Sequence, residues 1–183
     1  VEVCFHGSVG VAIAHHQMNL QQVLEAARTS EHFAKETLDR DALGIALLKR
    51  SGEHSTTGCK WYIIEKKHLE HEYGALQVLK EFAGMIDSGM VATAFIYELH
   101  AEKTGLEAIT REEEVMLEIR RLLLRHSDPS KKSEVENYFT RSLMPFFNEL
   151  HKTSFKKELP MSVLTQFIDL LEVAQFVGQG GRQ

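Results

Sequence analysis

The sequence is short of cysteine and long apolar runs and has no recognisable leader segment, and each shortage excludes a class of protein. Its two cysteines, Cys4 and Cys59, stand far apart without a Cys-x-x-Cys spacing, so we expect neither a disulfide framework nor a zinc site. A reducing cytoplasm is the simplest location for such a chain. No apolar run approaches the roughly 20 residues of a membrane span and no signal peptide is recognisable, so we expect a soluble protein without a membrane partner.

The sequence also lacks an excess of positive charge. It has 21 Lys and Arg against 26 Asp and Glu, which gives a formal net charge of -5. This balance argues against a basic protein that wraps nucleic acid unaided, although it leaves a local basic patch open. With 183 residues, of which 43% are hydrophobic, the chain is long enough for one ordinary domain or two small ones with a true core.

The clearest pattern that is present predicts a strand, a helix and a second strand. Residues Ser8 to Ala14 are uncharged and small or β-branched, as in a buried strand, and Ala42 to Leu48 form a second uncharged run. Asn19 is placed to cap the helix between them. The apolar stripe of that helix comprises Leu20, Val23, Leu24, Ala27, Ser30, Phe33 and Ala34. Together these segments have the size of a βαβ or split βαβ unit.

The rest of the chain is predicted to be mainly helical. We expect the polar segment Glu53–Gly58 to be a loop and a domain boundary, which gives one domain over residues 1–58 and another over residues 59–183. Cys59–Ile64 is either a last strand, which we favour, or an apolar lead-in to a helix. Beyond Glu65 we expect about five helices without a repeat period. The predicted fold class is therefore α+β, half an α/β domain followed by a helical bundle.

Capping and breaker residues predict where these helices end. One helical stripe ends near Asp87-Ser88-Gly89, and a second helix covers Met90–Lys103. Thr110 and Glu113 form a capping-box pattern for a third helix, which ends at His126-Ser127-Asp128-Pro129.

The fourth and last helices follow. Ser130–His151 is predicted to be one helix that Pro145 kinks or breaks, and Leu159-Pro160 begins the last helix. From Gly178 we expect a flexible tail. An aromatic cluster is predicted to form the core of the bundle rather than a platform for bases: Tyr138, Phe139, Phe146, Phe147, Phe155 and Phe167.

Three motifs carry a resemblance to a known family. They are Ala14-His15-His16 after the first strand, Ala34-Lys35 near the end of the helix, and the run from Ala42 to Gly52, ALGIALLKRSG. In this order they resemble the second half of a GGDEF-like palm domain, which is ferredoxin-like. More narrowly, they resemble the palm in the large subunit of type III CRISPR effector complexes, type III-B in particular. A helical domain after the palm is also similar to the layout of that subunit.

This resemblance implies a longer parent enzyme that joins ATP molecules into cyclic oligoadenylate when target RNA is bound, with Mg²⁺ or a similar ion. In the family a Gly-Gly-Asp-Asp hairpin holds the metal ions and lies upstream of the strand that corresponds to Ser8–Ala14. The only double glycine of this chain, Gly180-Gly181, lacks following aspartates. We therefore expect the C-terminal portion of a longer polypeptide, with no catalytic residue, no metal ligand and no synthase activity by itself.

The resemblance assigns two residues to the nucleotide. A lysine that follows alanine near the end of this helix contacts the triphosphate in GGDEF-like cyclases, and Lys35 holds that place. Arg40 is a second candidate, although the family has a Gly-Arg-Asn-like turn where this chain has Leu38-Asp39-Arg40-Asp41. A long cationic side chain can reach phosphate oxygens from the end of a helix. The alternative for both residues is an ordinary solvated surface cation.

Other polar groups have a structural explanation that we prefer. His15 and His16 are adjacent and would point opposite ways in an extended chain, so one ion cannot easily bind both. A second set at helical spacing, better explained as a solvated helix start, is Glu65, His68, His71 and Glu72. The basic pairs Lys49-Arg50 and Lys156-Lys157 are expected at the surface, although the first could lie near RNA in a larger complex.

The resemblance also implies partners. They are the small helical subunit and the backbone subunits of a CRISPR ribonucleoprotein, with CRISPR RNA and target RNA reached through the complex. Two alternatives remain open. In the first, the chain is a non-catalytic helical interaction module with a vestigial palm. In the second, it is part of a divergent GGDEF nucleotide cyclase.

Overall fold

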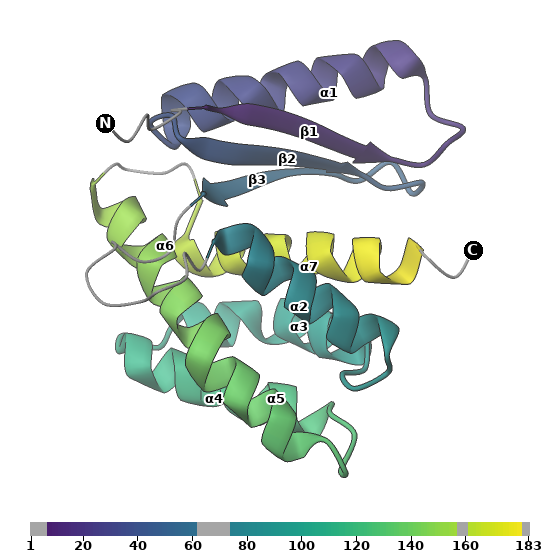
Figure 1. The fold of residues 1–183 in the computed structure, drawn as a ribbon. Helices are drawn as coiled ribbons and strands as arrows, with labels where there is room; N and C mark the ends of the chain where they lie inside the picture. Colours follow the sequence, from purple (N-terminus) through teal and green to yellow (C-terminus); the bar gives the residue numbers. More distant parts are fainter. Residues whose placement is uncertain (1–6, 62–73, 157–160, 181–183) are drawn as a thin grey trace, which may run out of the picture. The chain divides into compact units, whose positions relative to one another are not determined.

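The computed structural model describes residues 7–61, 74–156 and 161–180, and its fold is α+β (Figure 1). A three-stranded mixed sheet with a helix between two of its strands is followed by six α-helices in the described part of the chain. The chain divides into two compact units. We call them the sheet unit, residues 1–75 with 152–160, and the helical unit, residues 76–151 with 161–183.

The sheet unit confirms the predicted strand, helix and strand. β1 (Val9–Ala14) pairs in parallel with β2 (Ala42–Leu48), and α1 (Leu20–His32) forms the crossover between them. β3 (His54–Lys60) pairs with β2 in the antiparallel sense, so the strand order is β1-β2-β3. Every residue of the central strand β2 is buried, which is why its sequence carries no charge. Asn19 caps α1 as predicted, with its Oδ1 accepting a hydrogen bond from the Gln21 amide at 2.8 Å.

α1 runs along one face of the sheet (Figure 1), and two glycines let it come unusually close. Gly10 of β1 and Gly44 of β2 are register partners under the helix. A Cβ on Gly10 would lie 2.2 Å from the Glu31 amide nitrogen, and a Cβ on Gly44 would lie 2.0 Å from the Ser30 carbonyl oxygen. Ser30 is fully buried and donates from Oγ to the Ala26 carbonyl at 2.9 Å. The helix therefore packs backbone against backbone.

Two predictions for the sheet unit are wrong. Leu20 and Leu24 were expected on the buried stripe of α1, but they are 69% and 49% exposed, because a helix this close to the sheet buries small residues such as Ser30 instead. The polar segment Glu53–Gly58 is not a loop. Most of it belongs to β3, where cross-strand hydrogen bonding to β2 outweighs its turn-like composition.

The helical unit contains helices that the periodicity predicts, with shifted ends. In chain order they are α2 (Ala75–Asp87), α3 (Ala94–Glu107), α4 (Glu112–Arg125), α5 (Lys132–Tyr138), the π-helical turn η2 (Phe139–Leu143), α6 (Met144–Lys156) and α7 (Val163–Gly180). The first residue of α2 and the part of α6 from Lys152 onward belong to the sheet unit. The aromatic cluster is core, as predicted. The ring centroids of Phe147 and Phe167 lie 5.2 Å apart in an edge-to-face arrangement, and Tyr138, Phe139 and Phe146 are buried too. The side chain of Phe155 lies outside the described residues.

Several predicted helix ends are wrong for physical reasons. α3 continues through Gly105 because Leu106, one residue further, is buried and offsets the low helix propensity of glycine. The capping box at Thr110 and Glu113 does not form, since α4 begins after Arg111 without a side-chain cap. The prediction that α2 and α4 end near Asp87 and His126 is confirmed.

The predicted interruption of the helix around Pro145 is confirmed. α5 passes without a gap into the π-helical turn η2, and α6 begins at Met144, so the interruption lies just before the proline, which cannot donate a backbone hydrogen bond. The tail begins later than predicted, because α7 continues past Gly178. A Cβ there would lie 2.5 Å from the Ala83 carbonyl oxygen, so this glycine lets α7 pack closely on α2. None of the helices in the described residues is long and apolar enough to cross a membrane.

Candidate functional site

Lys35 lies in a π-helical turn that directly continues α1. This turn, η1 (Phe33–Thr37), contains the Ala34-Lys35 motif, and the Leu38 amide donates to the Phe33 carbonyl at 3.0 Å. Ala34 is fully buried, so the turn is anchored on the sheet while Lys35 faces solvent. Single π-helical turns are rare and are frequent at functional sites. The motif therefore has an unusual local backbone as well as a suggestive sequence.

The chain after this turn is left-handed for three residues. Asp39, Arg40 and Asp41 have φ angles of 59°, 58° and 44°, a region that costs an L-residue about 1 kcal/mol or more each. The Arg40 amide donates to the carbonyls of Ala34 at 3.0 Å and Lys35 at 3.2 Å. The structure therefore brings the two predicted site residues together at the level of the backbone. We call residues 33–41 the cationic turn.

The end of β3 holds the left-handed residues in place. Lys60 donates from Nζ to the carbonyls of Asp39 at 2.9 Å and Arg40 at 2.7 Å. The Trp61 amide donates to the Asp41 carbonyl at 3.3 Å. All three left-handed carbonyls thus accept a hydrogen bond from two consecutive residues of a segment that is distant in sequence.

The two candidate cations are in different states. Lys35 Nζ lies 2.6 Å from Glu31 Oε1, and this hydrogen bond and the charge of Lys35 lower the pKa of the Glu31 carboxyl. Arg40 is exposed, and its guanidinium has neither an ion pair nor a hydrogen bond among the described residues. Arg40 can therefore bind an anion directly, whereas Lys35 must first break its ion pair with Glu31.

This arrangement suits phosphate oxygens better than a metal ion. A lysine and an arginine within six residues offer a point charge and a planar set of donors, the two kinds of group that bind phosphates. Within residues 7–61, 74–156 and 161–180, no three His, Cys, Asp or Glu side chains gather in a way that could hold a metal ion. The cationic turn thus presents two side chains of the kinds that bind phosphate oxygens.

The predicted orientation of His15 and His16 is wrong. Their ring centroids lie 4.3 Å apart, because the chain turns here, with the Met18 amide donating to the His15 carbonyl at 2.9 Å. The Gln17 amide also donates to Nδ1 of His15 at 3.3 Å, which gives that ring a structural task. The second set of candidate ligands, Glu65, His68, His71 and Glu72, lies outside the described residues.

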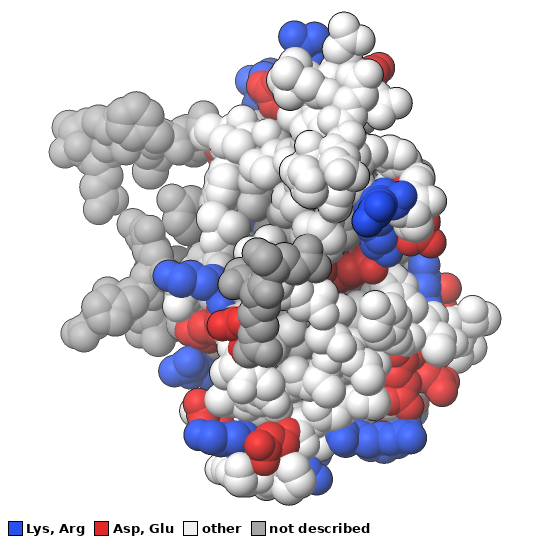
Figure 2. Space-filling model, turned by 90° about the vertical axis from the view of Figure 1, so that its right-hand side faces the viewer, with Lys and Arg blue, Asp and Glu red and all other residues white. Residues whose placement is uncertain are grey.

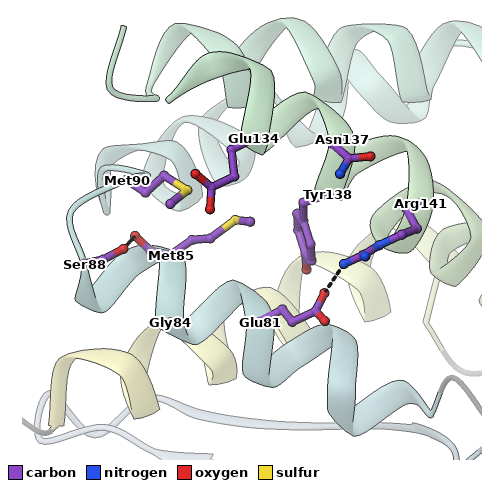
Figure 3. Close-up of a pocket in the computed structure, with 9 residues that line it drawn as sticks. All are labelled: Glu81, Gly84, Met85, Ser88, Met90, Glu134, Asn137, Tyr138 and Arg141. Atoms are coloured by element: carbon purple, nitrogen blue, oxygen red, sulfur yellow. Dashed lines mark hydrogen bonds and ion pairs between the residues drawn. The ribbon is translucent and has the colours of Figure 1, made fainter. Parts of the chain in front are cut away.

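The helical unit has a separate cavity of about 400 Å³ between α2 and α5 (Figure 3). The side chains of Met85, Met90 and Tyr138 line one shared space, and an ion pair of 3.6 Å between Arg141 and Glu81 closes one side. The remaining lining residues are Gly84, Ser88, Glu134 and Asn137. Methionines adapt to differently shaped apolar groups, so this cavity suits an apolar side chain of a partner.

Charges of both signs mingle on the face of the molecule in Figure 2, where Lys and Arg side chains stand beside Asp and Glu. Ion pairs account for several of the charged groups of the protein, including Arg120 with Glu136 and Arg125 with Glu98 at 2.8 Å. A surface that mixes its charges in this way does not form the continuous basic stripe of an unaided nucleic-acid binder on that face.

Comparison with known proteins gives no family assignment: no protein-family model matches this chain, and no curated protein matches it significantly. Function therefore has to be inferred from the motifs and from the geometry of the cationic turn.

The family resemblance points to Lys35 and Arg40 but not to Lys60 or to the backbone that surrounds them. Lys60 is 20 residues away from Arg40, and nothing in the sequence pairs a strand-end lysine with a particular turn. One signal was available for the left-handed turn. Two aspartates flank Arg40, and aspartate tolerates this conformation better than most residues that carry a Cβ.

Proposed function

We propose that this chain is the C-terminal portion of the large subunit of a type III CRISPR antiviral ribonucleoprotein. The parent chain is an ATP-using cyclic oligoadenylate synthase activated by target RNA, and this portion completes the nucleotide pocket and docks neighbouring subunits. The observation that carries the proposal is the position of the Ala34-Lys35 motif. It lies in a π-helical turn at the end of the crossover helix, hydrogen-bonded to the turn that presents Arg40.

In this proposal Lys35 and Arg40 bind the phosphates of ATP and hold them in position. The divalent ion of the parent chain stabilises the charge that develops on the phosphates, and its ligands belong to a Gly-Gly-Asp-Asp hairpin outside this chain. The cationic turn positions the triphosphate and supplies no proton transfer. A parent enzyme of this kind works in the cytoplasm.

The helical unit provides the second part of the proposal. Its methionine-lined cavity receives an apolar side chain from the small helical subunit or a backbone subunit of the complex. CRISPR RNA and target RNA are reached through those subunits. The same cavity supports the runner-up function, a non-catalytic interaction module, in which docking remains and nucleotide binding is lost.

The test is a titration of the isotope-labelled chain with ATP, followed in amide NMR spectra. We expect ATP to shift the signals of Lys35 and Arg40, and Lys35→Ala to weaken binding about tenfold, the effect of removing one charged hydrogen bond. Lys132→Ala is the matched control, because Lys132 is exposed on α5 and has no ion pair in the described residues. Equal loss in both variants, or no shift near residue 35, contradicts the proposal.

Docking is tested in the assembled complex. Met85→Asp should weaken association of the helical unit with its neighbours, because it replaces an apolar side chain of the cavity lining with a charged one. Leu117→Asp is the control, since Leu117 is an exposed apolar residue on α4 outside the cavity. If both variants assemble as well as the unaltered chain, the cavity is not a docking site.

A further inference from the structure

The left-handed turn at residues 39–41 is maintained although none of its residues is glycine. Glycine adopts positive φ without steric cost, whereas Asp39, Arg40 and Asp41 are each strained by it. Such strain persists where the surroundings over-determine the backbone, and it gathers at sites whose side chains are needed. The turn should therefore serve a particular side chain, and a particular group should maintain it.

The group that maintains the turn is Lys60. Its ammonium donates to two successive carbonyls, those of Asp39 and Arg40, at 2.9 and 2.7 Å. It stands at the last position of β3, opposite Ala42, the first residue of β2. The next residue, Trp61, donates its amide to the third carbonyl, that of Asp41. A side chain from the sheet thus holds two carbonyls of the turn, and the next residue along the chain holds the third.

The side chain that the turn serves is Arg40. Its amide is fixed by the carbonyls of Ala34 and Lys35, and its carbonyl is fixed by Lys60. The guanidinium extends into solvent without a partner in the described residues. A fixed backbone limits the directions that the side chain can take, and this lowers the entropy lost when the guanidinium meets a phosphate.

We propose that Lys60 is a positioning residue for phosphate binding, which acts through Arg40 by holding the left-handed turn. This inference rests on the proposed function of the cationic turn in binding the triphosphate of ATP. It adds a residue that lies on β3, outside the cationic turn, and belongs to none of the three motifs. Lys60 itself does not contact the phosphate.

A double-mutant cycle tests whether Lys60 acts through Arg40. ATP dissociation constants are measured by the same NMR titration for the unaltered chain, Arg40→Ala, Lys60→Met and the double variant. We expect each single variant to bind ATP about five- to tenfold more weakly and the double variant to bind no more weakly than Arg40→Ala alone. If the two losses multiply in the double variant, Lys60 acts independently of Arg40. If Lys60→Met binds ATP as tightly as the unaltered chain, Lys60 has no part in binding. Either of these two results overturns the inference.

Two controls separate positioning from a general loss of structure. Lys60→Arg keeps a cation that can donate to both carbonyls, so it should retain most of the affinity. Arg28→Ala removes a guanidinium like that of Arg40, but from the exposed face of α1, and should leave ATP binding unchanged. If Lys60→Arg fails as completely as Lys60→Met while both remain folded, the two carbonyl hydrogen bonds are not what matters.

Amide hydrogen exchange tests, without ATP, whether Lys60 holds the left-handed turn. In Lys60→Met the Arg40 amide should exchange at least about tenfold faster, because the turn that holds it opens more often. If the unaltered chain shows no response to ATP, the proposed function fails, and the exchange rate still decides whether Lys60 holds the turn. Unchanged exchange at Arg40 overturns the inference even if ATP binds.

Discussion

Gly44→Ala should destabilise the sheet unit strongly, although it adds one methyl group to a buried strand. The new Cβ would lie 2.0 Å from the Ser30 carbonyl oxygen and 2.8 Å from the Ser30 carbonyl carbon, and both are backbone atoms of α1. Ordinary contacts of a Cβ begin at 3.4 Å, so α1 must retreat by about 1.4 Å. No flexible side chain can absorb this shift, because the obstacle is the helix itself.

The expected cost follows from this displacement. Overpacking in a core typically costs about 1–3 kcal/mol, and a clash with backbone lies at the upper end of that range. With a urea dependence of about 1.5 kcal/mol per molar, a loss of about 3 kcal/mol lowers the unfolding midpoint by about 2 M. The neighbouring Gly10→Ala should behave alike, since its Cβ would meet the Glu31 amide nitrogen at 2.2 Å.

The assay is urea denaturation followed by tryptophan fluorescence. The chain has a single tryptophan, Trp61, which belongs to the sheet unit, so its emission reports the unfolding of that unit. Gly7→Ala is the matched control, because a Cβ there meets nothing within 4 Å and the midpoint should stay unchanged. If Gly44→Ala unfolds at the same urea concentration as Gly7→Ala, α1 does not pack backbone to backbone against β2.

Four further outcomes are expected. Burial raises the pKa of the Cys59 thiol to about 12, so in a Cys4→Ser variant a disulfide reagent should react at pH 8 only after unfolding, and rapid reaction of the native protein would refute this. Because that thiol ionises near pH 9 in the unfolded chain, stability should also fall from pH 9 upward, as far as the folded pKa. Glu31→Gln should tighten ATP binding several-fold, because it releases Lys35 from its ion pair and removes a negative charge. The urea midpoint of unfolding should change little, since an exposed ion pair contributes little stability. ATP titration and urea denaturation of the same samples measure both effects. The pKa of the Glu98 carboxyl is lowered by its hydrogen bond to His126 and by the charge of Arg125. The folding stability that Glu98 contributes is therefore present above pH 4.5 and is lost as the pH falls below that value. Acid unfolding of Glu98→Gln should accordingly depend less steeply on pH than that of the unaltered chain.

The strand, helix and strand were predictable because each is dictated by short-range patterns. An uncharged run of seven residues, Ala42–Leu48, has the length and composition of a strand buried at the centre of a sheet, and Asn19 before a periodic segment is well placed to begin a helix. The aromatic core was predictable for the same reason. Large apolar rings at helical spacing in a chain of this size have to pack against one another.

The errors arise where tertiary contacts override local preference. Leu20 and Leu24 follow the correct period, but the close approach that Gly10 and Gly44 permit leaves no room for leucine under α1. Ser55 and Gly58 resemble loop residues, yet they lie in β3 because β2 offers a complete ladder of hydrogen bonds.

The candidate site was predicted only as far as its side chains. Lys35 and Arg40 came from the family resemblance, whereas the π-helical turn, the left-handed turn and the contact with Lys60 depend on atoms that are brought together by the fold. Such details are decided by the sum of many small energies, and no local pattern encodes them.

The mixed pairing of β2 has a consequence for how the sheet unit folds. β2 and β3 are joined by a tight turn in which the Lys49 amide donates to the Glu53 carbonyl at 2.9 Å, so their contacts are local and should form within microseconds. β1 can pair with β2 only after the chain between Ala14 and Ala42 has closed into a loop, and α1 shortens that loop by becoming helical. We therefore expect substitutions in the β2–β3 hairpin to slow folding and substitutions in β1 mainly to accelerate unfolding. A polypeptide emerging from the ribosome would thus carry β1 unpaired until β2 had been made.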